Sequence, residues 1–346
     1  MKISDLTLKQ KISQMFIVGF VGQFFNLNKN FVDMIENGLG GVIFFSHNIT
    51  SEKQFKNLIQ NISEKAFIPM FYSIDQEGGR VERTEKIHNG KKYLSAKNAF
   101  EMGISYLQNQ TKEIALELKS YGINMNFAPV LDVNTNNDNP IIGERAFSNN
   151  TQEVTSAGKV VIKEYIKYGI IPVGKHFPGH GHASADSHKT LPIIDLPKEE
   201  LIKNHIQPFK EAIENDLPAI MVAHVLYPNL EELNLPASVS KKIINDILLE
   251  QLNFNGIVMT DDMEMNGIKC LSRLEACIKA INAGTTLFIY RDATKEIKQL
   301  INDIETAVKN GIIKEEYINS AVEKIFIIKH QFGIIQYKIT FLFSLF

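Results

Sequence analysis

The chain has 346 residues, a hydrophobic content of 44% and a formal net charge of −2 at pH 7. This length and apolar content permit one large core and suit a closed α/β barrel. Because the net charge is small and no run of Lys or Arg forms a basic arm, nucleic acid is not expected as a partner.

The sequence shows no pattern typical of export or membrane insertion. The apolar stretch at residues 15–20 is short and follows a polar helical pattern, unlike a signal peptide. No stretch reaches the length of a membrane span, so we expect no membrane contact. The two cysteines, Cys270 and Cys277, are expected two turns apart on one helix, too far to bridge, which favours a reducing compartment.

Eight short apolar runs recur along the chain, and each is a continuous hydrophobic stretch. Such runs are typical of parallel strands that are buried on both faces. The runs occupy residues 15–20, 41–45, 69–75, 125–130, 171–177, 218–225, 256–261 and 285–290.

Helical patterns separate these runs, as at residues 51–66, 151–169 and 272–284. The last of them ends in Gly284, a natural C-terminal stop for a helix. A further helical pattern at residues 314–332 is expected to close the fold.

Eight strand and helix units predict the fold class α/β, as a single (β/α)8 TIM-type barrel over residues 1–335. A short apolar tail, residues 336–346, follows. The alternative is a doubly wound open sheet, which is disfavoured because no GxGxxG turn follows a strand.

Polar residues follow five of the expected strands, where a barrel of this class carries its ligand site. Charged groups at five strand ends would meet at one mouth, so we expect a binding site there. The residues concerned are Asp75, Arg145, Lys175, His176, His224, Asp261 and Asp262.

The segment GKHFPGHGHASADSHKTLP, residues 174–192, holds four histidines: His176, His180, His182 and His188. Such a cluster could bind a metal, act as an acid–base device or line a sugar site. A zinc hydrolase is disfavoured because the sequence has neither HExxH nor CxxC spacing. We therefore expect no metal and no other cofactor.

Several motifs together are similar to those of a known family. They include IDQEGGRVER, FAPVLDV, NPIIGERAF, KHFPGHG, DSH and GIVMTDDMEM, and the similarity covers nearly the whole chain. The sequence resembles the bacterial β-N-acetylglucosaminidases of glycoside hydrolase family 3, of the single-domain peptidoglycan-recycling type.

The resemblance implies roles for individual residues. Asp261 would be the nucleophile of a retaining glycosidase. Asp186 would orient and activate His188 as the general acid–base, since residues two apart in an extended loop face the same side. Contacts to the sugar would come from Asp75, Arg83, Arg145, Lys175 and His176.

The resemblance also implies a substrate: peptidoglycan fragments with a terminal N-acetylglucosamine (GlcNAc) on 1,6-anhydro-N-acetylmuramic acid, processed in the cytoplasm by a monomer. A phosphorylase of the same family, a metal-dependent hydrolase and a non-catalytic sugar-binding protein are the alternatives. Two departures from the family pattern are His182 and the AGTT sequence at Gly284. The second predicts a smaller contribution of the eighth strand to the site.

Overall fold

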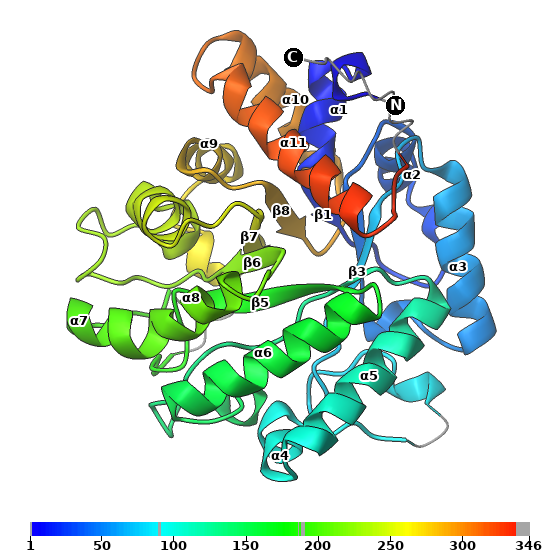
Figure 1. Ribbon diagram of the computed structural model, residues 1–346. Coiled ribbons are helices and arrows are strands. Elements are labelled where there is room, and N and C mark those ends of the chain that lie inside the picture. The colour runs from blue at the N-terminus through cyan, green and yellow to red at the C-terminus, as the bar shows by residue number, and fades with distance from the viewer. Residues whose placement is uncertain (1, 89–90, 186, 188–190, 337–346) are drawn as a thin grey trace, which may run out of the picture.

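A computed structural model of the chain describes residues 2–88, 91–185, 187 and 191–336. Eight parallel strands close into a barrel in chain order, with helices around it (Figure 1). The strands are β1 (Phe16–Val18), β2 (Gly41–Phe44), β3 (Phe71–Ile74), β4 (Met125–Asn126), β5 (Ile171–Phe177), β6 (Ala219–Val222), β7 (Ile257–Asp262) and β8 (Leu287–Tyr290). The predicted barrel is confirmed, and the open sheet is excluded because β1 pairs with β8.

The helices include every one that the sequence predicted, within two residues at each end. They are α1 (Leu8–Gln14), α2 (Lys29–Glu36), α3 (Glu52–Lys65), α4 (Ala96–Glu101), α5 (Ile104–Tyr121), α6 (Thr151–Lys167), α7 (Lys198–Glu200), α8 (Gln207–Ile213), α9 (Arg273–Ala283), α10 (Lys295–Lys309) and α11 (Glu315–Gln331). Gly284 ends α9 in the left-handed conformation, with φ of +108°, as expected for a glycine stop.

Two details differ from the sequence-based expectation. The ladder of β4 ends at Asn126, before Pro129, which has no amide hydrogen to donate. The chain stays beside β5 through a hydrogen bond from the Val173 amide to the Ala128 carbonyl and a bridge from Val130 to Lys175. Cys270 precedes α9 instead of sharing a helix with Cys277, and both thiols are free.

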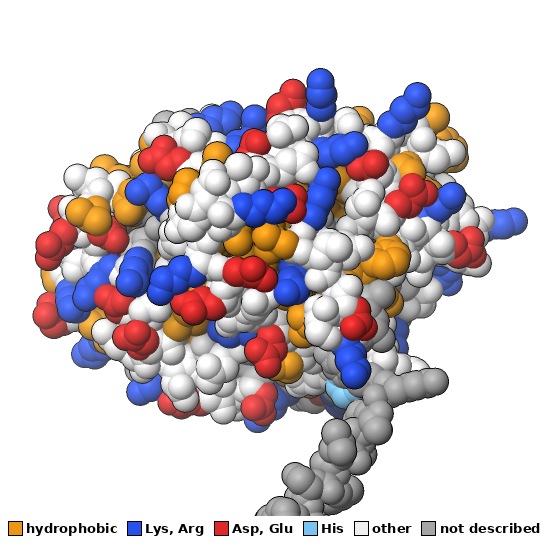
Figure 2. All heavy atoms as spheres, turned by 90° about the horizontal axis from the view of Figure 1, so that it is seen from above, with side chains coloured by type: hydrophobic (Ala, Val, Ile, Leu, Met, Phe, Trp, Pro, Cys, Tyr) orange, Lys and Arg blue, Asp and Glu red, His pale blue; other side chains and the backbone are white. Residues whose placement is uncertain are grey.

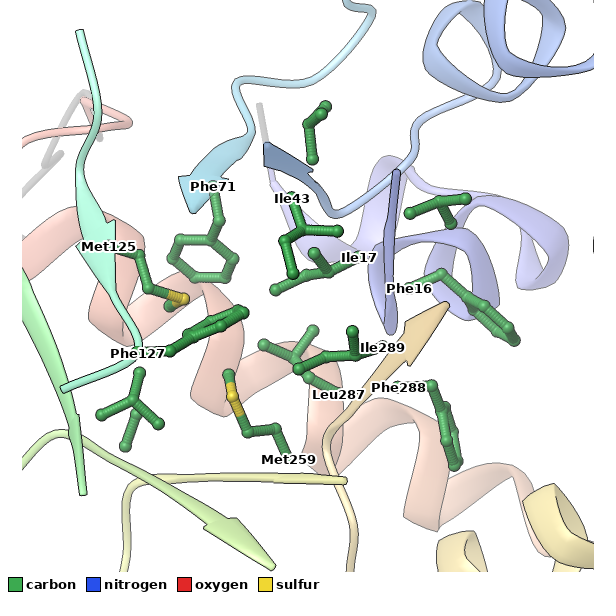
Figure 3. Packing of buried hydrophobic residues seen from close by; sticks show 14 of the residues in the cluster. Phe16, Ile17, Ile43, Phe71, Met125, Phe127, Met259, Leu287, Phe288 and Ile289 are labelled. Atoms are coloured by element: carbon green, nitrogen blue, oxygen red, sulfur yellow. The ribbon is translucent and has the colours of Figure 1, made fainter. Parts of the chain in front are cut away.

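Apolar side chains from different strands fill the barrel. Ile17, Phe71, Phe127 and Met259 pack together in its interior (Figure 3), and all four are at most 1% exposed. Layers of large apolar residues are typical of this architecture and fix the strand ends rigidly. Residues at those ends are therefore held on a stiff support.

The floor of the barrel contains a buried lysine. Lys329 of α11 donates from Nζ to Gln14 Oε1 and to the Pro69 carbonyl, both at 2.7 Å. Gln14 precedes β1 and Pro69 precedes β3, so this lysine lies at the amino ends of the strands. Burial lowers the pKa of the Lys329 ammonium to about 7.

The surface carries charges of both signs. Figure 2 shows Lys and Arg side chains interspersed with Asp and Glu on one face, without a large patch of one sign. In the described part of the chain, no helix combines the length and the apolar character that crossing a bilayer would require.

Candidate active site

A pocket of about 350 Å³ opens where the carboxyl ends of the strands meet. Its lining contains every described residue to which the family resemblance assigned a role in catalysis or sugar binding. These are Asp75, Arg83, Arg145, Lys175, His176 and Asp261. Asp186 and His188 lie outside the described residues, although Ser187 between them lines the pocket.

Lys175 lies in a network of buried charges on one wall. Its ammonium is 2.8 Å from Asp75 Oδ1 and 2.6 Å from Glu77 Oε1. Glu77 also accepts from Arg145 Nε and Nη2, both at 2.9 Å, in a bidentate pair. Burial would raise the pKa of the Glu77 carboxyl, but Arg145 and Lys175 outweigh it and the pKa falls well below its ordinary value.

Arg83 completes this wall. Its guanidinium lies 3.5 Å from Asp75 Oδ2 and lines the pocket. Among the described residues, its ion pair is with Asp75 and not with the neighbouring Glu82 or Glu85. Hydroxyl groups of a sugar both donate and accept, so alternating carboxylates and cations suit a pyranose.

Asp132 holds the start of the histidine segment. Its Oδ2 is 2.8 Å from His176 Nδ1, and its Oδ1 accepts from the backbone amides of His176 and His180, at 3.2 and 2.6 Å. Burial acts to raise the pKa of Asp132, but the adjacent histidines outweigh it and lower the pKa. An ionised Asp132 therefore sets the orientation of the His176 ring.

Asp261 and Asp262 have different environments at the end of β7. Asp261 is half-buried, and this desolvation alone would raise the pKa of its carboxyl, but the neighbouring His176 and His224 lower the pKa below its ordinary value. Its Oδ1 also accepts from the Asp262 amide at 2.8 Å. For Asp262, burial raises the pKa, despite an ion pair with Arg291 at 2.6 Å. Asp261 is thus the carboxylate kept ionised in the pocket.

One expectation about a neighbouring strand is corrected. His224 was expected to line the pocket, but it is buried and outside the lining of the described site. Its ring lies 2.6 Å from Ser238 Oγ and 3.2 Å from the Asp262 carbonyl, so it supports the end of β7. The smaller contribution expected of the eighth strand stays a prediction: Ile289 of β8 lines the pocket, and Arg291, directly after the strand, pairs with Asp262.

His180 and His182 support the loop through hydrogen bonds to different partners. The His180 ring lies 3.1 Å from Ser187 Oγ, and that of His182 lies 2.8 Å from Thr135 Oγ1. Across residues 2–88, 91–185, 187 and 191–336, no group of three potential ligands could hold a metal ion.

His205 lies behind this loop, in a π-helical segment before α8. Its ring centre is 6.2 Å from that of His182, and its Cβ lies 2.8 Å from where a side chain on Gly179 would begin. Burial lowers the pKa of His205, and that of His180, to about 4. Both rings are therefore neutral at pH 7.

Glu77 and Asp132 belong to the site although the sequence motifs did not predict a role for them. Glu77 lies three residues after the end of β3 and Asp132 six residues after the end of β4, within the quoted motifs IDQEGGRVER and FAPVLDV. Their position in the loop after a strand was the feature that could have indicated a role. Neither residue lines the pocket, because each binds side chains that do line it.

Comparison with known proteins decides the family. The sequence profile of the glycosyl hydrolase family 3 N terminal domain matches residues 7–328. The chain belongs to glycosyl hydrolase family 3. This family 3 hydrolase is 33% identical over 288 residues to a beta-hexosaminidase of Haemophilus influenzae, covering 81% of this chain and 80% of that protein.

Other relatives are longer. The family 3 hydrolase is 32% identical to the beta-hexosaminidase A of Pseudoalteromonas piscicida, covering 83% of this chain but only 52% of that protein. It is also similar to the solved family 3 beta-N-acetylglucosaminidase of Paenibacillus sp., with a TM-score of 0.90 and 32% identity, over 98% of this chain and 65% of that one. The resemblance of the motifs to the β-N-acetylglucosaminidases of family 3 is therefore confirmed, and the chain is a glycoside hydrolase.

Proposed function

We propose that the protein is an exo-acting, retaining β-N-acetylglucosaminidase. The observation that carries this proposal is the half-buried, ionised Asp261, which lines one small pocket together with Asp75 and Lys175. A pocket of about 350 Å³ is at the low end of ligand sites, which favours one terminal sugar over an extended glycan. The names of the family 3 relatives support hexosamine as the sugar.

In this proposal Asp261 attacks the anomeric carbon while the bond to the leaving oxygen breaks and His188 donates a proton to that oxygen. Water then attacks the glycosyl ester, gives its proton to His188 and restores the Asp261 carboxylate. The placement of Ser187 in the pocket lining supports this role for the residues on either side of it.

The proposed natural substrates are cytoplasmic peptidoglycan fragments with a terminal GlcNAc, as the motif resemblance implies. The decisive assay compares an aryl β-N-acetylglucosaminide with the matching aryl β-glucoside. We expect turnover of the first only, and equal turnover of both would refute the proposal. Product analysis with and without phosphate distinguishes the hydrolase from a phosphorylase, which would release a sugar phosphate.

A further inference from the structure

A buried cluster of charges lies beside Arg83, outside the pocket. His88 Nδ1 is 2.8 Å from Glu82 Oε1, and His88 Nε2 is 2.6 Å from Glu117 Oε1. The side chain of His88 is fully buried, and those of Glu82 and Glu117 are 5% and 18% exposed. In the part of the chain that the structure describes, each of these carboxylates forms its ion pair with His88 and with no other cation.

This arrangement requires a charged imidazole. A neutral ring has one N–H and can donate to one carboxylate, whereas an imidazolium donates from both nitrogens. Burial would lower the pKa of His88, but Glu117 and Glu82 outweigh it and raise the pKa to about 9. His88 is therefore the cation that neutralises these buried carboxylates at pH 7.

The cluster fastens the segment between β3 and α4 to α5. Glu117 belongs to α5, whereas Glu82 and His88 belong to that segment. Glu117 also accepts from Thr84 Oγ1 at 3.0 Å and from the Tyr93 hydroxyl at 2.7 Å. Glu117 is thus held by three partners, while the only ion pair of Glu82 among the described residues is with His88.

Arg83 lies between two members of this cluster. Glu82 and Thr84 are buried in the cluster, whereas Arg83 is half-buried, lines the pocket and contacts Asp75. The backbone is fixed here, since the amides of Arg83 and Thr84 both donate to Gln76 Oε1, at 2.8 and 3.3 Å. What remains variable is the direction of the charged side chains, and Glu82 is the carboxylate next to Arg83 in the chain.

We infer that His88 is a positioning residue that keeps Glu82 away from Arg83, so that the Arg83 guanidinium is free to bind the terminal sugar. Without His88, the Glu82 carboxylate would lose its cation, and the adjacent guanidinium would be the nearest replacement. The inference rests on the proposed function, in which Arg83 contacts that sugar. His88 itself lies outside the lining of the described pocket.

The test measures kcat and KM for an aryl β-N-acetylglucosaminide. Arg83→Gln should raise KM roughly tenfold, as for loss of a hydrogen bond to a charged group. His88→Gln should raise KM by up to this factor. Its kcat should change less, because a contact made to the sugar both before and during the reaction affects binding alone.

Two double variants separate the direction of Glu82 from the charge of the cluster. His88→Gln with Glu82→Gln and His88→Gln with Glu117→Gln each remove one positive and one negative charge, so both keep the net charge of the wild-type cluster and should fold. Only the first removes the competing carboxylate, so its KM should return toward the wild-type value. The second leaves Glu82 unpaired, so its KM should stay as high as that of His88→Gln. If His88→Gln alone does not fold, the two double variants are compared directly with the wild type.

Two results would overturn the inference. One is a wild-type KM in folded His88→Gln, and the other is an equal KM in the two double variants, which would mean that His88 only balances the charge of the cluster. An active wild type whose KM is unchanged in Arg83→Gln would remove the role of Arg83, and this inference with it. A wild type without activity on the aryl β-N-acetylglucosaminide would instead refute the proposed function.

Discussion

Glu77 Oε1 lies 2.6 Å from the ammonium of Lys175, and both side chains are almost fully buried, at 3% and 2% exposure. Because the same carboxylate also binds Arg145 in a bidentate pair, one residue outside the pocket lining fixes two cations inside it.

Glu77→Gln should therefore weaken both fold and function. Removing one partner of a buried charge pair commonly lowers the free energy of unfolding by about 3 kcal/mol, and Gln keeps the shape while losing the charge. We expect a reduced unfolding midpoint in urea and a kcat/KM lowered mainly through KM. Wild-type stability together with wild-type KM would contradict the role of Glu77.

Asp261→Ala should abolish turnover while the fold is retained. The proposed nucleophile is lost, but a carboxylate at a strand end contributes little to the core. A slow fluorinated β-N-acetylglucosaminide should label Asp261 in the wild type, as mass spectrometry of the digested protein would show. Asp262→Asn is the control, and labelling of Asp262 instead would refute the assignment.

His188→Ala should reduce kcat by roughly two to four powers of ten on natural substrates, the range of a general acid–base. An activated aryl leaving group needs less protonation, so its rate should fall less. The comparison of kcat for the two substrate types is the measurement. A similar loss on both would indicate that His188 only binds.

His205→Leu should make the protein less sensitive to acid. The pKa of His205 is about 4 in the fold against an ordinary 6.5, so below pH 6.5 the unfolded chain takes up a proton that the folded chain does not. Stability is thus lost as pH falls from about 6.5 to 4, at up to about 1.4 kcal/mol per pH unit for one proton. Leu has no ring to protonate, so the unfolded variant does not take up this proton.

The measurement is the free energy of unfolding at pH 7, 6, 5 and 4.5. At pH 7 the variant should be close to the wild type, and its decline toward acid should be shallower. His330→Asn, at an exposed position on α11, is the control. Parallel curves for His205→Leu and the wild type would disprove the assignment.

The barrel was predictable because each strand is a continuous apolar run between helical patterns, as at β5, which matches residues 171–177. The presence of Asp75 and Lys175 in one pocket was predictable because strand ends of a barrel converge. The sequence could not reveal that Glu77 lies behind Lys175, since such contacts depend on side-chain packing between strands. The orientation of His224 toward Ser238 likewise depends on tertiary contacts.

The contacts of Lys329 couple the local unfolding of α11 to that of the first strand. Its ammonium joins α11 to Gln14 and Pro69, which are 315 and 260 positions away along the chain. Detachment of the last helix would leave both oxygen atoms unpaired and an apolar floor open to solvent. Amides of α11 and of the first strand should therefore exchange hydrogen for deuterium together, as one cooperative unit that spans both ends of the described chain.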